Sequence, residues 1–185
     1  MTGRLRNLVR KLARDQRGVS AVEFAMLAPL MLTMYFGTIE VSQGIAIDRK
    51  VTLTARTIAD LASQVTSINN ADMTNLLKAT AAEISPYPTD KLAVTVSLVK
   101  IDASKNATIV WSDTLNGTAR AKDSTVTLPG GLLVANTSLV WGEVSYAYTP
   151  VIGYQMTGTE PEGSTLYAPA ALRHHRAPDN LIYRA

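Results

Sequence analysis

The sequence predicts an α+β domain attached to a single transmembrane helix. Near the N-terminus, an apolar run of membrane-spanning length contains one acidic residue. Farther along, apolar residues recur every three or four positions, which is the period of an amphipathic helix. After Pro88, apolar and polar residues alternate, which is the period of a half-buried strand. Helices followed by antiparallel strands are typical of an α+β fold, with the helices packed on a small antiparallel sheet.

Residues 1–18 form a basic leader. The chain has a formal net charge of +3, and the leader holds six basic residues against Asp15, so it carries +5 and the remainder carries −2. Basic residues beside a first transmembrane helix hold that flank in the cytoplasm. We therefore attribute the basic pI of the sequence, about 9.2, to membrane topology and not to nucleic-acid binding. The expected topology residues are Arg4, Arg6, Arg10, Lys11, Arg14 and Arg17.

The apolar run covers residues 19–39, and as a helix it would extend about 31 Å, enough to cross a hydrocarbon core about 30 Å thick. Glu23 is its only residue charged at neutral pH. A carboxylate at a helix centre costs about 2.5–3.5 kcal/mol on insertion scales, which the apolar side chains outweigh, and such an acid is a functional-site hypothesis by default. Pro29 removes a backbone donor and predicts a kink, while Gly37 and Gly44 are weak points for a break.

The helix is predicted to continue beyond the membrane as an amphipathic spine that ends near Ile68. Its apolar stripe is too short for a sustained heptad array, so we expect it to be buried on the protein's own domain. The stripe consists of Val51, Ala55, Ile58, Leu61, Ala62, Val65 and Ile68. A second helix should begin at the cap Asn69-Asn70-Ala-Asp72 and end before Ser85-Pro86. Its apolar side consists of Met73, Leu76, Leu77, Ala81 and Ile84.

Strands are predicted in the second half of the chain. Residues 92–99 alternate with period two, residues 102–106 form a turn, and residues 108–112 return, which predicts a hairpin. Residues 125–128 are expected to form a short strand. The last strand is predicted over 139–148, with Val140, Val144, Tyr146 and Tyr148 on one face and Trp141 and Glu143 on the other. From Thr149 onward, Pro, Gly and Thr predict an irregular C-terminal tail.

The sequence carries no signature of the common enzyme classes. It has no cysteine, no G-x-S-x-G motif, no phosphate-binding loop and no H-E-x-x-H motif. His174-His175 is flanked by two arginines, and adjacent histidines rarely bind one metal together, so we expect a solvated pair. We therefore predict no enzymatic activity, no metal and no cofactor. The main aromatic residues are expected mostly in the core, which leaves carbohydrate adhesion as a hypothesis.

The residues around the leader carry a specific resemblance. Arg17-Gly18 precedes the apolar run, Ala21-Val22-Glu23-Phe24-Ala25 follows, and Pro29 comes four residues later. This pattern resembles the TadE-like family of the Tad/Flp pilus systems. Asp48-Arg49-Lys50 and residues 58–61 are more weakly similar to the membrane-proximal helix of some relatives.

The resemblance implies a processed membrane subunit with a pilin-like fold. A prepilin peptidase would cleave after Gly18, so that the mature pseudopilin-like chain begins at Val19. Residues 1–18 would be the cytoplasmic leader, 19–40 the transmembrane helix in the bacterial inner membrane, and 41–185 a periplasmic α+β domain with an irregular tail from about 149. The implied partners are the prepilin peptidase, other pilin or pseudopilin subunits, Tad inner-membrane components and the lipid bilayer, with no nucleic acid. Incorporation into a surface pilus is left open.

Glu23 is the expected assembly charge. Cleavage after Gly18 would create an α-amine on Val19, four residues and about one helical turn before Glu23. The carboxylate could neutralise this amine in its own chain, while resemblance to pilins implies pairing with the amine of a neighbouring subunit. The main alternative is an uncleaved bitopic protein of the inner membrane that scaffolds or binds other pilus or secretion components. A membrane-anchored periplasmic enzyme is a further alternative, and it lacks an evident polar site.

Overall fold

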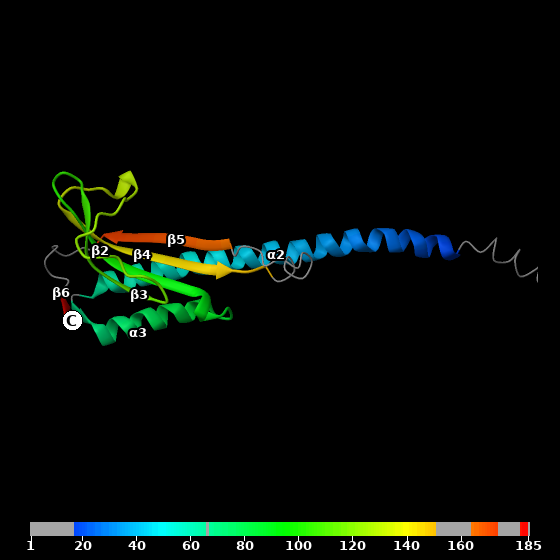
Figure 1. Cartoon of the computed structure of the whole chain (residues 1–185), viewed down its shortest axis with the longest axis horizontal. Helices are drawn as coiled ribbons and strands as arrows, with labels where there is room; N and C mark the ends of the chain where they lie inside the picture. Colours follow the sequence, from blue (N-terminus) through cyan, green and yellow to red (C-terminus); the bar gives the residue numbers. More distant parts are fainter. Residues whose placement is uncertain (1–16, 66, 151–163, 174–181, 185) are drawn as a thin grey trace, which may run out of the picture. The chain divides into compact units, whose positions relative to one another are not determined.

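The computed structural model describes residues 17–65, 67–150, 164–173 and 182–184. The chain divides into two compact units, residues 1–42 and 43–185. Helix α2 (Arg17–Gln64) supplies all the described residues of the first unit and the first helix of the second. The predicted α+β fold is confirmed: a long apolar N-terminal helix is followed by a second helix and a small antiparallel sheet (Figure 1).

Helix α2 is helical throughout, including Pro29, Gly37 and Gly44, so the break considered at Gly44 does not occur. The predicted end near Ile68 is wrong, because α2 ends at Gln64 and Ile68 lies in strand β1 (Ser67–Asn69). Ile68 is nevertheless buried in the same apolar core as the α2 stripe. Apolar periodicity thus located the buried side chain correctly without distinguishing a helix from the short strand that follows it.

The second helix begins where the sequence predicts. In α3 (Asn70–Ala81), the N-cap Asn69 accepts a hydrogen bond from the backbone N–H of Asp72 at 2.8 Å. A short 3-10 helix (Ala82–Ile84) extends it. The Lys50 ammonium on α2 then donates hydrogen bonds to the carbonyl oxygens of Glu83 and Ser85, at 3.1 and 2.7 Å. This cation satisfies carbonyl groups at a helix C-terminus and ties the end of the second helix to α2.

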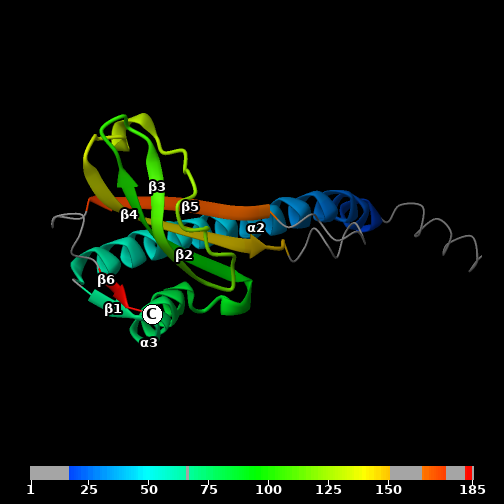
Figure 2. The same ribbon diagram turned by 60° about the vertical axis from the view of Figure 1, so that its left-hand side comes forward.

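The main sheet has four antiparallel strands in the order β3-β2-β4-β5. The strands are β2 (Leu92–Ile101), β3 (Ala107–Leu115), β4 (Thr137–Tyr148) and β5 (Ser164–Arg173). The predicted hairpin is confirmed, and Asp102 closes its turn by accepting hydrogen bonds from the Asn106 backbone and side chain. A separate parallel pair joins β1 to β6 (Ile182–Arg184), as Figure 2 shows.

Two predictions for the C-terminal half are wrong. Residues 125–128 form an isolated bridge between Thr125 and Thr108 and no strand. The tail expected to be irregular from Thr149 contains β5 and β6. Pro169 weakened the strand pattern there, but β5 is at the end of the strand order, where a missing backbone donor is tolerated.

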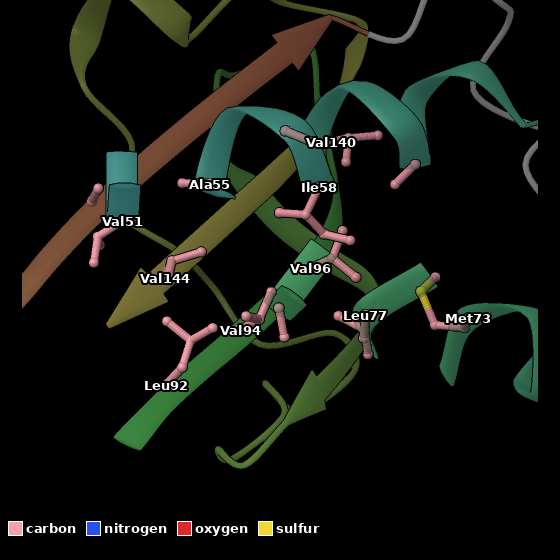
Figure 3. Close-up of a cluster of buried hydrophobic side chains, with 14 of the residues drawn as sticks. Val51, Ala55, Ile58, Met73, Leu77, Leu92, Val94, Val96, Val140 and Val144 are labelled. Atoms are coloured by element: carbon pink, nitrogen blue, oxygen red, sulfur yellow. The ribbon is translucent and has the colours of Figure 1, made fainter. Parts of the chain in front are cut away.

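Helices α2 and α3 cover one face of the sheet. Val51, Ala55 and Ile58 of α2 pack with the even-numbered residues of β2 and β4, and Met73 and Leu77 of α3 complete the core (Figure 3). The apolar stripe predicted on α2 is therefore buried within the protein's own domain, as expected. Tyr146 also lies in this core, which confirms the face predicted for it in the strand at 139–148, now β4.

The opposite face of the sheet is only partly covered. The segment between β3 and β4 folds over one end of it and forms a second apolar cluster. The buried members of this cluster are Val99, Ile101, Ala107, Ile109, Leu128, Leu139 and Trp141. At the other end, residues of β2, β4 and β5 line a polar hollow. One face of the sheet therefore packs against the helices, and the opposite face carries an apolar cluster at one end and a polar hollow at the other.

Candidate functional site

The first candidate site is the apolar segment of α2. The described part of the chain contains one helix, Gly18–Gln64, that is long and apolar enough to cross a membrane, and none of its most apolar stretch is buried. Large apolar side chains around the whole circumference are exposed, including Phe24 at 69% and Met26 at 77%. Side chains of this kind on all sides of a helix are suited to lipid or to contacts with other apolar helices.

The polar side chains of this segment are satisfied locally. The hydroxyls of Thr33, Thr38 and Ser42 each donate a 2.8 Å hydrogen bond to the backbone carbonyl four residues earlier. A hydroxyl bonded in this way needs no partner from solvent or from another chain. These hydroxyls therefore do not oppose placement of the segment in a hydrocarbon environment.

Glu23 differs from these hydroxyls. Its side chain is exposed, and it makes no hydrogen bond or ion pair with the described residues. It lies four residues after Val19 on the same helix, which places the two residues one turn apart. The site therefore has an unsatisfied acid next to the position where the sequence predicts a new N-terminus.

Gly18 lies within α2, and a Cβ added at this position would meet no atom within 4 Å. The remaining predicted topology residues Arg4, Arg6, Arg10, Lys11 and Arg14 lie outside the described residues. Arg17 begins the helix. His174-His175 also lies outside the described residues. Within them, no group of three metal-binding side chains occurs.

A second candidate site lies on the face of the sheet that the helices leave open. Arg120, from the segment between β3 and β4, donates two hydrogen bonds to the Glu143 carboxylate, at 2.8 Å from Nε and 2.6 Å from Nη2. The Tyr167 hydroxyl of β5 donates a third, at 2.6 Å. Glu143 is only 8% exposed, so the three bonds hold a buried carboxylate in its charged form.

These contacts change the pKa values of the participants. Burial by itself would raise the pKa of Glu143, but the hydrogen bonds from Arg120 and Tyr167 outweigh it and lower that pKa. The indole nitrogen of Trp141 adds to this effect, although it does not reach full hydrogen-bond geometry. Burial and the bond to Glu143 raise the pKa of Tyr167 to about 12. Tyr167 therefore stays a hydrogen-bond donor at neutral pH.

Sequence reasoning placed Glu143 on the correct face of its strand but missed this cluster. Tyr167 fell in the expected irregular tail, and Arg120 lies in a polar loop with no periodic pattern. The available signal was that Glu143 shares a strand face with the large aromatic Trp141, and the structure shows that both are buried. A buried carboxylate requires a partner of opposite charge, but the sequence alone does not say which cation supplies it.

The comparisons with known proteins bear on the first site. Residues 18–60 match the family model described as TadE-like protein. The chain carries a TadE-like segment. No curated protein and no solved structure matches the chain.

The TadE-like match lies wholly within α2, beginning at Gly18 and ending at Asp60. It confirms the resemblance inferred from the apolar run, beginning at Gly18. A TadE-like segment suggests a component associated with the Tad pilus. The apolar helix and the TadE-like segment together fit a membrane-associated protein.

Proposed function

We propose that the protein is a pseudopilin-like structural subunit required for assembly of a Tad/Flp pilus. In this proposal it is made as a precursor in the inner membrane, with the leader in the cytoplasm and residues 41–185 in the periplasm. The observation that carries the proposal is the composition of the TadE-like segment: an apolar helix with exposed side chains, a single acid at Glu23 and a glycine at the junction with the basic leader.

Processing would be hydrolysis of the Gly18–Val19 peptide bond by a prepilin peptidase. Water adds across the bond, so that the leader leaves with a carboxylate on Gly18 and the subunit gains an α-amine on Val19. An α-amine has an ordinary pKa of about 7.7–8.0 and is cationic at neutral pH. An unpaired charge at the start of an apolar helix is costly, and Glu23 is the nearest group that can offset it.

Glu23 would make processing a switch for assembly. Before cleavage, Val19 has a neutral amide nitrogen that cannot form an ion pair. After cleavage, the amine of one subunit can pair with Glu23 of a neighbour when two helices pack with a stagger. The Glu23 side chain is exposed and makes no hydrogen bond with the described residues, so it is available for such a contact.

The direct test of processing is N-terminal sequencing of the membrane-bound protein from cells that contain the peptidase. We expect Val19 as the first residue, and we expect Gly18→Val to accumulate as the full-length precursor. Gly37→Val is the matched control, because both glycines have open space for a new side chain and lie in the same helix. Cleavage of the Gly18→Val chain, or a full-length native product, would refute processing and favour the uncleaved inner-membrane scaffold.

Glu23→Gln tests the assembly charge. The variant should be inserted and cleaved, because the amide is less costly in a membrane than the carboxylate, but it should fail to support pilus formation. Glu23→Asp retains the negative charge and should preserve at least part of the pilus yield. Pilus yield and helix crosslinking are measured beside an immunoblot of processing. Normal assembly by the Gln variant would show that the charge has no role in registration.

Topology can be measured with one introduced thiol, because the chain contains no cysteine. Ser104→Cys is exposed in the turn between β2 and β3. In cells with a permeabilised outer membrane, a membrane-impermeant maleimide should label it without lysis of the inner membrane. Labelling only after complete lysis would place the domain in the cytoplasm and contradict the proposal.

A further inference from the structure

The open face of the sheet contains a hollow that is separate from the TadE-like segment. Its volume is about 420 Å³, which lies within the range of about 300–1,000 Å³ for small-ligand sites. Thr95, Thr118, Arg120, Glu143, Ser145 and Tyr167 line it together with two alanines. From this arrangement, we propose that the hollow binds a neutral saccharide.

The floor of the hollow is held in place by strand pairing and hydrogen bonds. Thr95 on β2 and Tyr167 on β5 lie on either side of the β4 residues Glu143 and Ser145, because Thr95 pairs with Glu143 and Ser145 pairs with Tyr167 in the sheet register. Glu143 is fixed by Arg120 and Tyr167, at the distances given above. A ligand would thus meet side chains already held in place, which lowers the entropic cost of binding.

The charge of the site favours a neutral ligand. The Arg120 side chain is 39% exposed, but its charge is compensated by the carboxylate that it holds. An anion would gain attraction from Arg120 and lose much of it to repulsion from Glu143, which remains ionised because its pKa is lowered. The guanidinium has five N–H donors, and two of them are used by Glu143, so the others can bind neutral oxygen acceptors.

The remaining lining fits a polyol with an apolar side. Thr118 and Ser145 contribute hydroxyls, each of which can donate and accept a hydrogen bond. Tyr167 is 53% exposed, so its aromatic surface is accessible although its hydroxyl is bound to Glu143. A sugar ring has hydroxyls at its edge and C–H groups on its face, and it can use both kinds of surface at once. A purely apolar ligand would leave the hydroxyls and the guanidinium unsatisfied.

The experiment measures binding of N,N′,N″-triacetylchitotriose to the full chain by saturation-transfer NMR and titration. The protein is kept in a zwitterionic detergent without sugar headgroups, because a maltoside would compete for the hollow. Maltotriose and inorganic phosphate are titrated in parallel, so that an N-acetylated sugar, a plain hexose sugar and an anion are compared. We expect saturable, submillimolar binding of at least one of the two sugars.

Variants of Tyr167 decide whether this site is responsible. Tyr167→Leu removes the aromatic surface and should weaken saccharide binding by about fivefold to tenfold, whereas Tyr167→Phe keeps the ring and should retain most of it. Tyr35→Leu is the matched control, since it makes the same change at an exposed tyrosine of the apolar helix. Each variant is first checked for native tryptophan fluorescence, which reports on the sheet.

The proposal is overturned by absence of saturable binding of either sugar, by tighter binding of phosphate, or by equal losses in the Leu and Phe variants. The outcome does not depend on cleavage after Gly18, because the hollow is formed entirely by residues of the second unit. Failure of saccharide binding would therefore leave the proposed assembly function untouched, and failure of processing would leave this site untouched.

Discussion

The contact between α2 and strand β4 makes Gly142 the most sensitive glycine in the described part of the chain. A Cβ built at Gly142 would lie 2.8 Å from the backbone oxygen of Ala55, 3.0 Å from Cγ2 of Ile58 and 3.2 Å from Cβ of Ala59. The nearest obstacle belongs to the helix backbone, so it cannot be relieved by rotation of a side chain. We expect Gly142→Ala to force α2 away from the sheet.

The size of the effect follows from this geometry. An extra methyl group forced into a packed core typically costs about 1–3 kcal/mol. Because the helix must move as a unit and three contacts are tight, we expect about 2–3 kcal/mol at Gly142. For a chain of this size, each kcal/mol lowers Tm by about 2–4 °C, so the expected decrease is about 4–12 °C.

The two tryptophans provide a local assay for this prediction. Trp111 and Trp141 are the only tryptophans in the chain, and both are buried in the sheet of the second unit. Thermal unfolding of the full chain, followed by tryptophan fluorescence, therefore reports on this unit and not on the apolar segment. Gly131→Ala is the matched control, because nothing lies within 4 Å of its added Cβ. A Gly142→Ala variant with the Tm of the control would refute the argument that glycine is needed for close packing.

Two further predictions concern the stability of the same unit. Glu143→Gln should lower stability at pH 7 by about 1–3 kcal/mol, because it weakens the charge-assisted bonds from Arg120 and Tyr167. The lowered pKa of Glu143 means that this contribution is fully present above the unfolded value of about 4.3 and is lost as the pH falls through the folded value. The difference between native protein and variant, measured by denaturant unfolding, should therefore shrink below about pH 4; a difference that is constant with pH would contradict it. Asn69→Ala should lower the free energy of unfolding by about 1 kcal/mol, because the α3 cap is lost, whereas Asn69→Ser should lower it less. Equal Tm values for the two variants would show that the cap does not contribute to stability.

The sequence predicted the elements whose apolar residues follow one regular period. The α2 stripe, the start of α3 and the two faces of β4 were correct, because each buries residues at a spacing that matches its backbone. The strand β5 was missed, because Pro169 interrupts it and edge strands tolerate residues that central strands do not. The apolar cluster that contains Leu128 was missed for another reason. It forms where a segment without periodicity folds over the sheet.

The candidate sites were predictable to different extents. Gly18 and Glu23 are contiguous with the leader, so their relation is visible in the sequence, and their roles stay predictions. The hollow combines Arg120, Glu143 and Tyr167, which come from a loop and two strands, and only the sheet register brings them together. A functional arrangement made from distant segments has no local signature, even when one member, such as a buried glutamate, indicates that a partner must exist.

The two halves of α2 meet different physical requirements within one helix. Before residue 43 its large side chains are exposed and apolar, whereas from Ile47 onward one side of the helix is buried against the sheet and the other carries charged residues. The TadE-like match covers both kinds of surface and stops before the sheet begins. The matched residues therefore include an exposed apolar part of the helix and a part that packs against the sheet. They do not include any residue of the open sheet face. For this reason we expect changes in the hollow to alter ligand binding without altering cleavage after Gly18, and changes at Glu23 to alter assembly without altering the hollow.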